Sequence, residues 1–355
     1  MATPYHRLAR ETPAYAWWKL PLAALVIGAI YLGLTLLFVG GAAVYYAVAD
    51  TSKTLDDWFD AVGELDVENL DFFVLDMLSL VLLIPAVLLG VLATGPRPVG
   101  YVSSVAGRLR WRWLGLTAVI ASVVSVVTIG GSLIVSELTD PADVSAPSSL
   151  DVRVIVAIAV ILLVVPLQSA AEEYLFRGYL MQLVGAWSRF AVLPIVLTTP
   201  LFVAGHGYGL WGLLDVGLFG VTAAILTIRT GGLEAAIAAH AANNVVLFVL
   251  DALGMIAATD DSDAGPVDLV PTVVSSIAIV FLIEWAARRQ GIQRTRESIP
   301  DPPRPEAPMW PPPPYAMVWY PQPTYAAAES GRPARSELHP DTPEYPGELP
   351  ADWRG

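Results

Sequence analysis

The fold is decided by residues 160–177, which read VILLVVPLQSAAEEYLFR. A run of apolar side chains leads directly into two adjacent carboxylates and an arginine, Glu172, Glu173 and Arg177. Ionisable groups are costly to place inside a membrane, so each one in an apolar segment is a hypothesis for a functional site. This stretch therefore predicts a membrane helix that carries a polar centre.

The composition of the whole chain agrees with a membrane protein. Its 355 residues are 55% hydrophobic and only 15% charged, and the mean hydropathy is +0.57. These values lie outside the range of soluble globular domains. A helix needs about 20 apolar residues to cross a bilayer. We therefore predict an all-α, polytopic transmembrane bundle of about eight spans, at 20–49, 72–94, 113–135, 152–168, 192–205, 210–228, 233–257 and 269–286.

The loops between these spans predict the orientation of the chain. Arginine and lysine gather before the first span and after the second, fourth, sixth and eighth, and the alternate loops are acidic. Loops rich in arginine and lysine stay in the cytoplasm. We expect an integral protein of a prokaryotic plasma membrane with both termini cytoplasmic. The net charge of -13 argues against nucleic acid as a partner.

The pattern divides the chain into four parts. Residues 1–19 form a cytoplasmic segment, 20–150 carry the first three spans with acidic outer loops, and 151–289 form a catalytic helical core of spans four to eight. Residues 290–355 are rich in proline and predict a disordered cytoplasmic tail whose partner is unknown. The chain has no cysteine, which excludes disulfides and thiolate chemistry.

Glu173 and Arg177 are four residues apart, a spacing that lets them pair on one helix face. Glu172 lies about 100° away around the helix axis, so it can face a cavity. We therefore expect the 152–168 helix to continue through residue 180. An unpaired glutamate in a desolvated pocket suits a general base. The alternative is that all three charges lie in water at the end of the span, with no chemical role.

Two further apolar segments carry a histidine each. His206 follows Phe202 by four residues, and His240 precedes Asn244 by four, among many alanines. Small residues let helices approach closely. A histidine and an amide on one face can bind a metal or stabilise an oxyanion. Alternatively, the two residues are hydrogen-bonding contacts between helices, and His206 is a satisfied buried or interfacial residue.

Three motifs occur in order: Glu172-Glu173-x-x-x-Arg177, Phe202-x-x-x-His206 and His240-x-x-x-Asn244. In this the sequence resembles the CPBP family of intramembrane proteases, also known as the Rce1-like, CAAX-protease and bacteriocin-processing family. The resemblance covers about residues 150–250. It implies an endopeptidase in which Glu172 activates a water, His206 and His240 bind zinc or position the water, and Asn244 stabilises the oxyanion. Glu173 and Arg177 would hold their helix in register.

The resemblance implies a site for zinc made by Glu172, His206 and His240, and a membrane-associated protein or peptide as substrate. Two other functions stay open. One is an ion or proton-coupled transporter in which the same charges form a relay. The other is a non-catalytic family member that acts as a membrane scaffold or immunity protein.

Full-length spans would place the predicted site residues at different depths. Glu172 would lie near one end of its span and His206 near the opposite end of the next. We therefore expect that the 192–205 segment is short or re-entrant, or that a tilted segment starts at Pro166. Among the other acids, we expect Glu284 to pair with Arg288. Asp76 and Asp215 line the cavity or bond within the bundle, and Asp251 lies near the outer surface.

Overall fold

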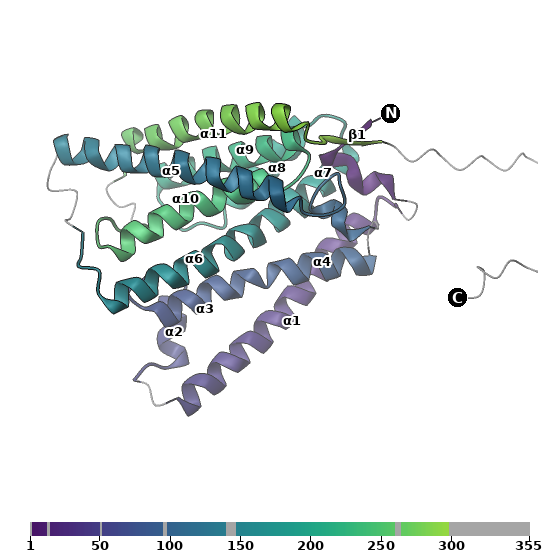
Figure 1. The fold of residues 1–355 in the computed structure, drawn as a ribbon. Helices are drawn as coiled ribbons and strands as arrows, with labels where there is room; N and C mark the ends of the chain where they lie inside the picture. The colour runs from purple at the N-terminus through teal and green to yellow at the C-terminus, as the bar shows by residue number, and fades with distance from the viewer. Residues whose placement is uncertain are drawn as a thin grey trace, which may run out of the picture. The chain divides into compact units, whose positions relative to one another are not determined.

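The computed structural model describes residues 2–12, 15–49, 52–94, 98–139, 147–259 and 264–297. These residues are mainly helical, which confirms the predicted all-α class (Figure 1). The proline-rich part of the predicted tail, from residue 298 onward, lies outside the described residues. Just before it, β2 (Thr295–Glu297) pairs antiparallel with β1 (Ala2–Pro4). Regular structure thus continues past residue 290, where the tail was predicted to begin.

Among the described residues, seven helices are long and apolar enough to cross a membrane. Four of them are single elements: α1 (Lys19–Val48), α5 (Trp111–Thr139), α9 (Leu210–Thr230) and α10 (Glu234–Ala252). Another joins α3 (Leu70–Val81) and α4 (Leu83–Thr94), and another joins η4 (Pro266–Asp268) and α11 (Leu269–Gln290). The seventh joins α6 (Val152–Glu173), the π-helical segment η3 (Tyr174–Leu180) and α7 (Met181–Trp187).

The helix that carries the glutamates is longer than a single span. It runs without interruption from Val152 to Trp187, which is 36 residues or about 54 Å of helical rise. The predicted continuation through residue 180 is confirmed. Glu172 consequently lies well inside the helix and not near its end, because seven residues of η3 and seven of α7 follow Glu173.

The predicted fifth span forms the short helix α8 (Val192–Val203). Its 12 residues rise about 18 Å, less than the roughly 30 Å of a hydrocarbon core. The chain then turns at residues 204–209 and returns as α9, which packs against α8. The expectation of a short segment here is confirmed. His206, just past the end of α8, therefore does not reach the far side of the bundle.

α10 is the central helix of the bundle and packs against α5, α6 and α9. Its first seven residues, 234–240, are all buried and include Ala235, Ala236, Ala238 and Ala239. Because alanine has no side chain beyond Cβ, neighbouring helices approach the α10 backbone closely. This packing brings His240 next to the helix that carries Glu173.

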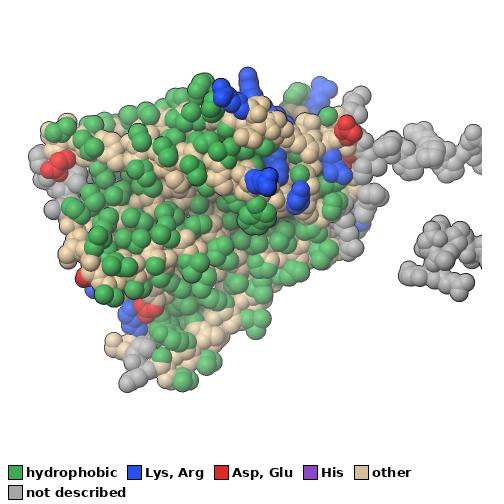
Figure 2. Space-filling view, viewed as in Figure 1, with side chains coloured by type: hydrophobic (Ala, Val, Ile, Leu, Met, Phe, Trp, Pro, Cys, Tyr) green, Lys and Arg blue, Asp and Glu red, His purple; other side chains and the backbone are tan. Residues whose placement is uncertain are grey.

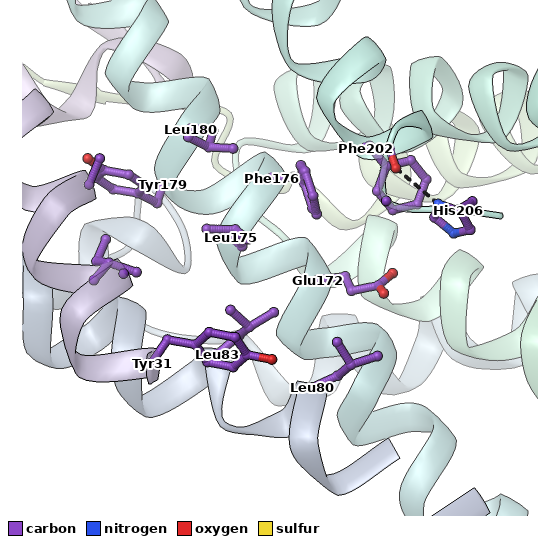
Figure 3. A pocket seen from close by; sticks show the side chains of 14 residues that line it. Tyr31, Leu80, Leu83, Glu172, Leu175, Phe176, Tyr179, Leu180, Phe202 and His206 are labelled. Atoms are coloured by element: carbon purple, nitrogen blue, oxygen red, sulfur yellow. Dashed lines mark hydrogen bonds between the residues drawn. The ribbon is translucent and has the colours of Figure 1, made fainter. Parts of the chain in front are cut away.

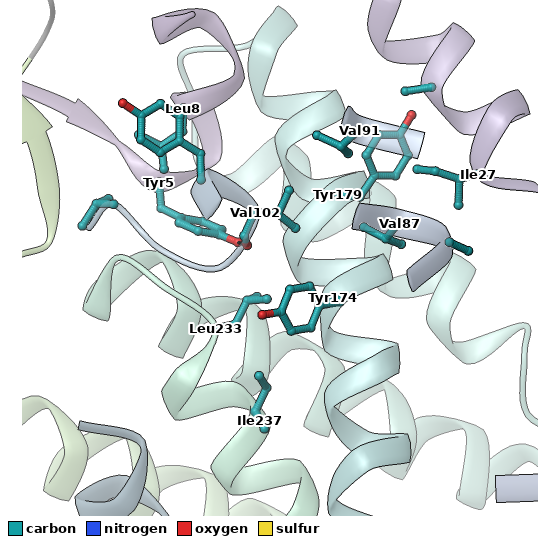
Figure 4. Close-up of a cluster of buried hydrophobic side chains, with 14 residues drawn as sticks. Tyr5, Leu8, Ile27, Val87, Val91, Val102, Tyr174, Tyr179, Leu233 and Ile237 are labelled. Atoms are coloured by element: carbon teal, nitrogen blue, oxygen red, sulfur yellow. Dashed lines mark hydrogen bonds between the residues drawn. The ribbon is translucent and has the colours of Figure 1, made fainter. Parts of the chain in front are cut away.

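One end of the bundle is closed by short segments that surround the η2 loop (Val99–Val102). The 3₁₀ helix η1 (Tyr5–Glu11) packs against α7 there. The Tyr5 hydroxyl donates to the carbonyl oxygen of Val102, and Gln182 donates to that of Tyr101 over 2.7 Å. Figure 4 shows this apolar cluster, in which Val102 lies between Tyr5 and the pair Tyr174 and Leu233. The cluster fixes the start of η3, directly after the glutamates.

The surface between the two ends of the bundle is mostly apolar. Large hydrophobic side chains are exposed along the helices, as on Leu37, Val127, Leu163 and Phe281. Figure 2 shows lysine and arginine gathered at the end of the molecule where β1 and α7 lie. An apolar middle between polar ends is typical of a protein that lies in a bilayer. Its predicted orientation stays a prediction.

Candidate active site

The polar centre is built around the side chain of Glu173. Its Oε1 accepts a hydrogen bond from Nη1 of Arg177 over 2.9 Å and another from Nδ1 of His240 over 2.9 Å. Glu173 and Arg177 are both buried. The predicted pairing of these two residues is therefore present. The link to His240 was not predicted, and it joins α6 to α10 through a charged group.

Arg177 is held on every side by polar or aromatic partners. Its Nη2 donates to the carbonyl oxygen of Gly220 over 3.1 Å, and its guanidinium lies 4.2 Å from the ring centroid of Phe202. A Cβ on Gly220 would lie 3.3 Å from that Nη2 and 3.3 Å from the Phe202 ring. Arg177 thus anchors the η3 segment to α8 and α9.

Glu172 approaches the other nitrogen of the His240 ring. Its Oε2 lies 3.6 Å from Nε2 of His240. This Oε2 is buried and has no hydrogen-bond partner among the described residues. Because Glu173 accepts from Nδ1, that nitrogen carries a proton, and Nε2 is left to face Glu172. A buried carboxylate oxygen without a protein partner is suited to hold a water.

His206 is oriented by its own segment. Its Nδ1 lies 3.0 Å from the carbonyl oxygen of Phe202. A carbonyl only accepts, so Nδ1 is the donor and Nε2 of the neutral ring is free to accept. The Phe202 ring contacts both histidines, with centroid distances of 4.9 Å to His206 and 6.0 Å to His240. Phe202 therefore separates and positions the two imidazoles.

Asn244 lies one helical turn beyond His240 on α10 and is half-buried. Its Oδ1 accepts a hydrogen bond from Nδ2 of Asn243 over 3.2 Å. Since its carbonyl oxygen is engaged, the Asn244 amide presents its NH₂ group as a donor. Asn244 does not line the pocket that Glu172 and His206 face.

Glu172 and His206 face a common pocket of about 430 Å³ (Figure 3). Apart from Glu172, His206 and Tyr31, its wall is almost wholly apolar, with Leu80 and Leu83 among the residues opposite Glu172. The pocket thus takes residues from α1, α3 and α4, which precede the segment predicted as the catalytic core. That division of the chain stays a prediction.

The side chains do not form a ready metal site. Among the described residues, no three His, Cys, Asp or Glu side chains form a group that could hold a metal ion. The predicted set of Glu172, His206 and His240 is therefore not assembled in this arrangement. In both histidines Nδ1 makes a hydrogen bond, to Phe202 in one and to Glu173 in the other, and Nε2 is the nitrogen that remains for another ligand.

The other acids in the apolar helices have separate roles. Asp76 accepts hydrogen bonds from the indole of Trp58 over 2.8 Å and from the backbone N–H of Gly63. It therefore anchors the helix α2 (Leu55–Ala61) and bonds within the bundle, which was one of the two alternatives predicted for Asp76. Glu284 pairs with Arg288 as predicted, and also with Arg229 and Arg294. Asp215 lines a second, smaller cavity and not the pocket of Glu172.

Comparison with known proteins agrees with the family predicted from the motifs. Residues 153–246 match the family described as Type II CAAX prenyl endopeptidase Rce1-like. The uncharacterized protein YyaK of Bacillus subtilis (strain 168) is 33% identical over 102 residues, which are 27% of this chain and 34% of that protein. The chain thus matches about a third of the length of this relative. No solved structure matches.

The structure and the match define an integral membrane protein with an Rce1-like segment. The predicted resemblance is confirmed for residues 153–246, which contain Glu172, Glu173, Arg177, His206, His240 and Asn244. The description of the matched family names a prenyl endopeptidase.

Proposed function

We propose that this chain is an intramembrane endopeptidase that hydrolyses a peptide bond of a membrane-associated protein or peptide, with Glu172 as the base that activates water. The observation that carries the proposal is the position of Glu172 on the wall of a pocket shared with His206. Its Oε2 is buried there and makes no hydrogen bond to any residue that the structure describes. The Rce1-like match of residues 153–246 supports the reaction class.

The reaction needs one water and two proton transfers. Glu172 takes a proton from the water while the oxygen atom of the water adds to the carbonyl carbon of the substrate. When the carbon–nitrogen bond breaks, the protonated Glu172 gives this proton to the leaving amine. The products are a carboxylic acid and an amine. The same carboxyl group thus acts as base and then as acid.

The neighbouring residues have supporting roles in this proposal. His240 lies 3.6 Å from Glu172 and is oriented by Glu173, so its Nε2 helps to hold the water. The Asn244 amide and His206 are the candidates for stabilising the negative charge on the carbonyl oxygen. Arg177 holds the Glu173 side chain in place through its 2.9 Å contact, and acts as a positioning residue.

The pocket suggests what kind of substrate reaches Glu172. A volume of about 430 Å³ with an apolar wall accommodates an apolar side chain or a lipid group beside the scissile bond. The matched family is described as prenyl endopeptidases, and an apolar pocket is compatible with such a group. The exposed apolar side chains of the helices support a substrate that lies in the same bilayer.

Zinc at Glu172, His206 and His240 stays a prediction. If bound, zinc would polarise the water and the substrate carbonyl. Metal analysis of the purified protein, compared with His206→Ala and His240→Ala, tests it. Zinc in equal amounts in all three proteins would exclude this site, whereas stoichiometric zinc lost from both variants would confirm it.

The proposal is tested by incubating the protein in proteoliposomes with a mixture of membrane proteins and identifying new N-termini by mass spectrometry. We expect new termini with the wild type that fall at least about 100-fold with Glu172→Ala. Glu137→Gln is the matched control, because Glu137 is exposed on α5 and lies outside the pocket. Identical termini with the wild type and Glu172→Ala, or none with either, would refute the peptidase assignment.

A further inference from the structure

A second cavity lies between α5, α9, α10 and α11, on the other side of the His240 helix from α6. Its volume is about 20 Å³. A cavity needs roughly 10–15 Å³ to hold one water, so this one has room for a single small ligand. Its wall is mainly polar, with contributions from Ser125, Asp215, Thr222, Asn243, Thr272 and Ser276.

The carboxylate of Asp215 is the only charged group that lines this cavity among the described residues. A hydrogen bond from Thr272 reaches its side chain, but Oδ1 is buried and has no hydrogen-bond partner within the described part of the chain. The nearby charge of Asp268 is also negative. A buried carboxylate in an apolar helix is costly unless a positive charge or a proton compensates it.

The other polar lining groups are hydroxyls and one carboxamide, and each of these can present an oxygen atom, whereas Phe219, Ala239 and Ile279 complete the wall with apolar side chains. Oxygen ligands suit hard cations. With a single carboxylate, a monovalent cation gives a neutral site, whereas a divalent cation would leave an unpaired positive charge in the membrane. The small volume favours an ion that has shed its water. Thr222 and Ser276 already bond to each other over 2.9 Å, which fixes part of the wall.

We propose that this cavity binds a small monovalent cation, with Na⁺ as the ion of matching size, between Asp215 and the hydroxyl groups of α9 and α11. This cavity and the candidate active site are both lined by residues of α10 or their direct neighbours. Asn243, on its wall, donates to Asn244 over 3.2 Å. Phe219, also on its wall, contacts the ring of His240 at a centroid distance of 4.9 Å. A bound cation therefore stabilises the side of α10 that carries His240 and Asn244.

The test uses the thermal unfolding of the full-length protein in detergent, followed by tryptophan fluorescence. NaCl is titrated against choline chloride at constant ionic strength. A ligand that binds only the folded state raises the Tm as its concentration rises above the Kd. We expect a saturable rise with Na⁺ that choline does not give. Asp215→Asn, which keeps the shape and removes the charge, should weaken the apparent affinity at least tenfold.

Asp251→Asn is the matched control, because Asp251 of α10 is half-buried, as Asp215 of α9 is, but does not line the cavity. It should keep the full response to Na⁺. Ser276→Ala provides a second variant if Asp215→Asn does not fold, and should weaken the Na⁺ response several-fold. An equal response to Na⁺ and choline in the wild type would overturn the proposal, and so would an unchanged Na⁺ response in both Asp215→Asn and Ser276→Ala. Binding is measured without peptidase activity, so the result is independent of the proposed function.

Discussion

Oε1 of Glu173 lies 2.9 Å from Nδ1 of His240 and 2.9 Å from Nη1 of Arg177, so one buried oxygen atom joins two helices. The two adjacent glutamates consequently have different tasks. Glu173 is held at Oε1 by an arginine and an imidazole, whereas Glu172 has only His240 near its Oε2, at 3.6 Å, and lies on the wall of the pocket. The difference arises because the side chains of neighbouring residues point about 100° apart on a helix.

Removing one partner of the buried pair should destabilise the protein strongly. Glu173→Gln leaves the Arg177 guanidinium buried without its counter-charge, which costs about 3–5 kcal/mol. The free energy of unfolding, or the Tm in detergent, measures this loss. The double variant Glu173→Gln with Arg177→Met removes both charges and should recover part of it. A single variant as stable as the wild type would contradict the role given to this pair.

Gly185 of α7 should be intolerant of any side chain. A Cβ there would collide with the backbone carbonyl oxygen of His6, and backbone cannot move aside cheaply. We expect Gly185→Ala to displace η1 and to speed proteolysis near residues 5–11. Gly115→Ala is the control, since nothing lies within 4 Å of a Cβ at that position on α5. Equal cleavage rates for the two variants would show that η1 does not depend on this contact.

His6 should make the docking of η1 sensitive to acid. Burial lowers the pKa of His6 below its usual 6.5, and the charge of Arg7 acts in the same direction. Above pH 6.5 the ring is neutral whether η1 is docked or released, so stability is unaffected. As the pH falls below 6.5, the released form takes up the proton first, and docking is weakened. Hydrogen exchange of residues 5–11, corrected for the intrinsic amide exchange rate that itself falls with pH, should show a larger open fraction at pH 5 than at pH 8. His6→Gln should abolish this dependence.

Gly220 should limit the position of Arg177. A Cβ at this residue would lie 3.1 Å from Cγ2 of Thr199 and 3.3 Å from Nη2 of Arg177. We expect Gly220→Ala to lower any peptidase activity more than it lowers the Tm, because it shifts Arg177 and hence Glu173. Gly217→Ala, where the nearest atom is 3.5 Å away, provides the comparison on the same helix. The two variants should differ in activity if the Arg177 position matters.

Local features of the site could be predicted from the sequence. Glu173 and Arg177 are four residues apart, and that spacing alone indicates a pair on one helix. The continuation of the helix past Gln168 could also be predicted, because no break follows in the sequence. Contacts across the bundle could not. Glu173 and His240 are 67 positions apart and meet only because the alanines of α10 let α6 approach.

The depth of each group could not be derived from hydropathy. If every helix crossed the membrane fully, Glu172 and His206 would lie at different depths. In the structure both line one pocket, because α8 has only 12 residues. The residues of α1, α3 and α4 that line this pocket could not be predicted from the sequence, because an apolar side chain that faces a pocket cannot be distinguished there from one that faces lipid. The strands β1 and β2 are three residues each, too short for a pattern to show.

The central claim, that Glu172 activates the water for hydrolysis, is tested most directly by following oxygen from water into product. An intact membrane peptide that the wild type cleaves is incubated in water enriched in ¹⁸O with each of three proteins: the wild type, Glu172→Gln and Glu137→Gln. We predict one ¹⁸O atom in the new carboxyl group for the wild type and Glu137→Gln, and at least about 100-fold less product for Glu172→Gln at an unchanged Tm. Product formed by Glu172→Gln at the wild-type rate would contradict the account.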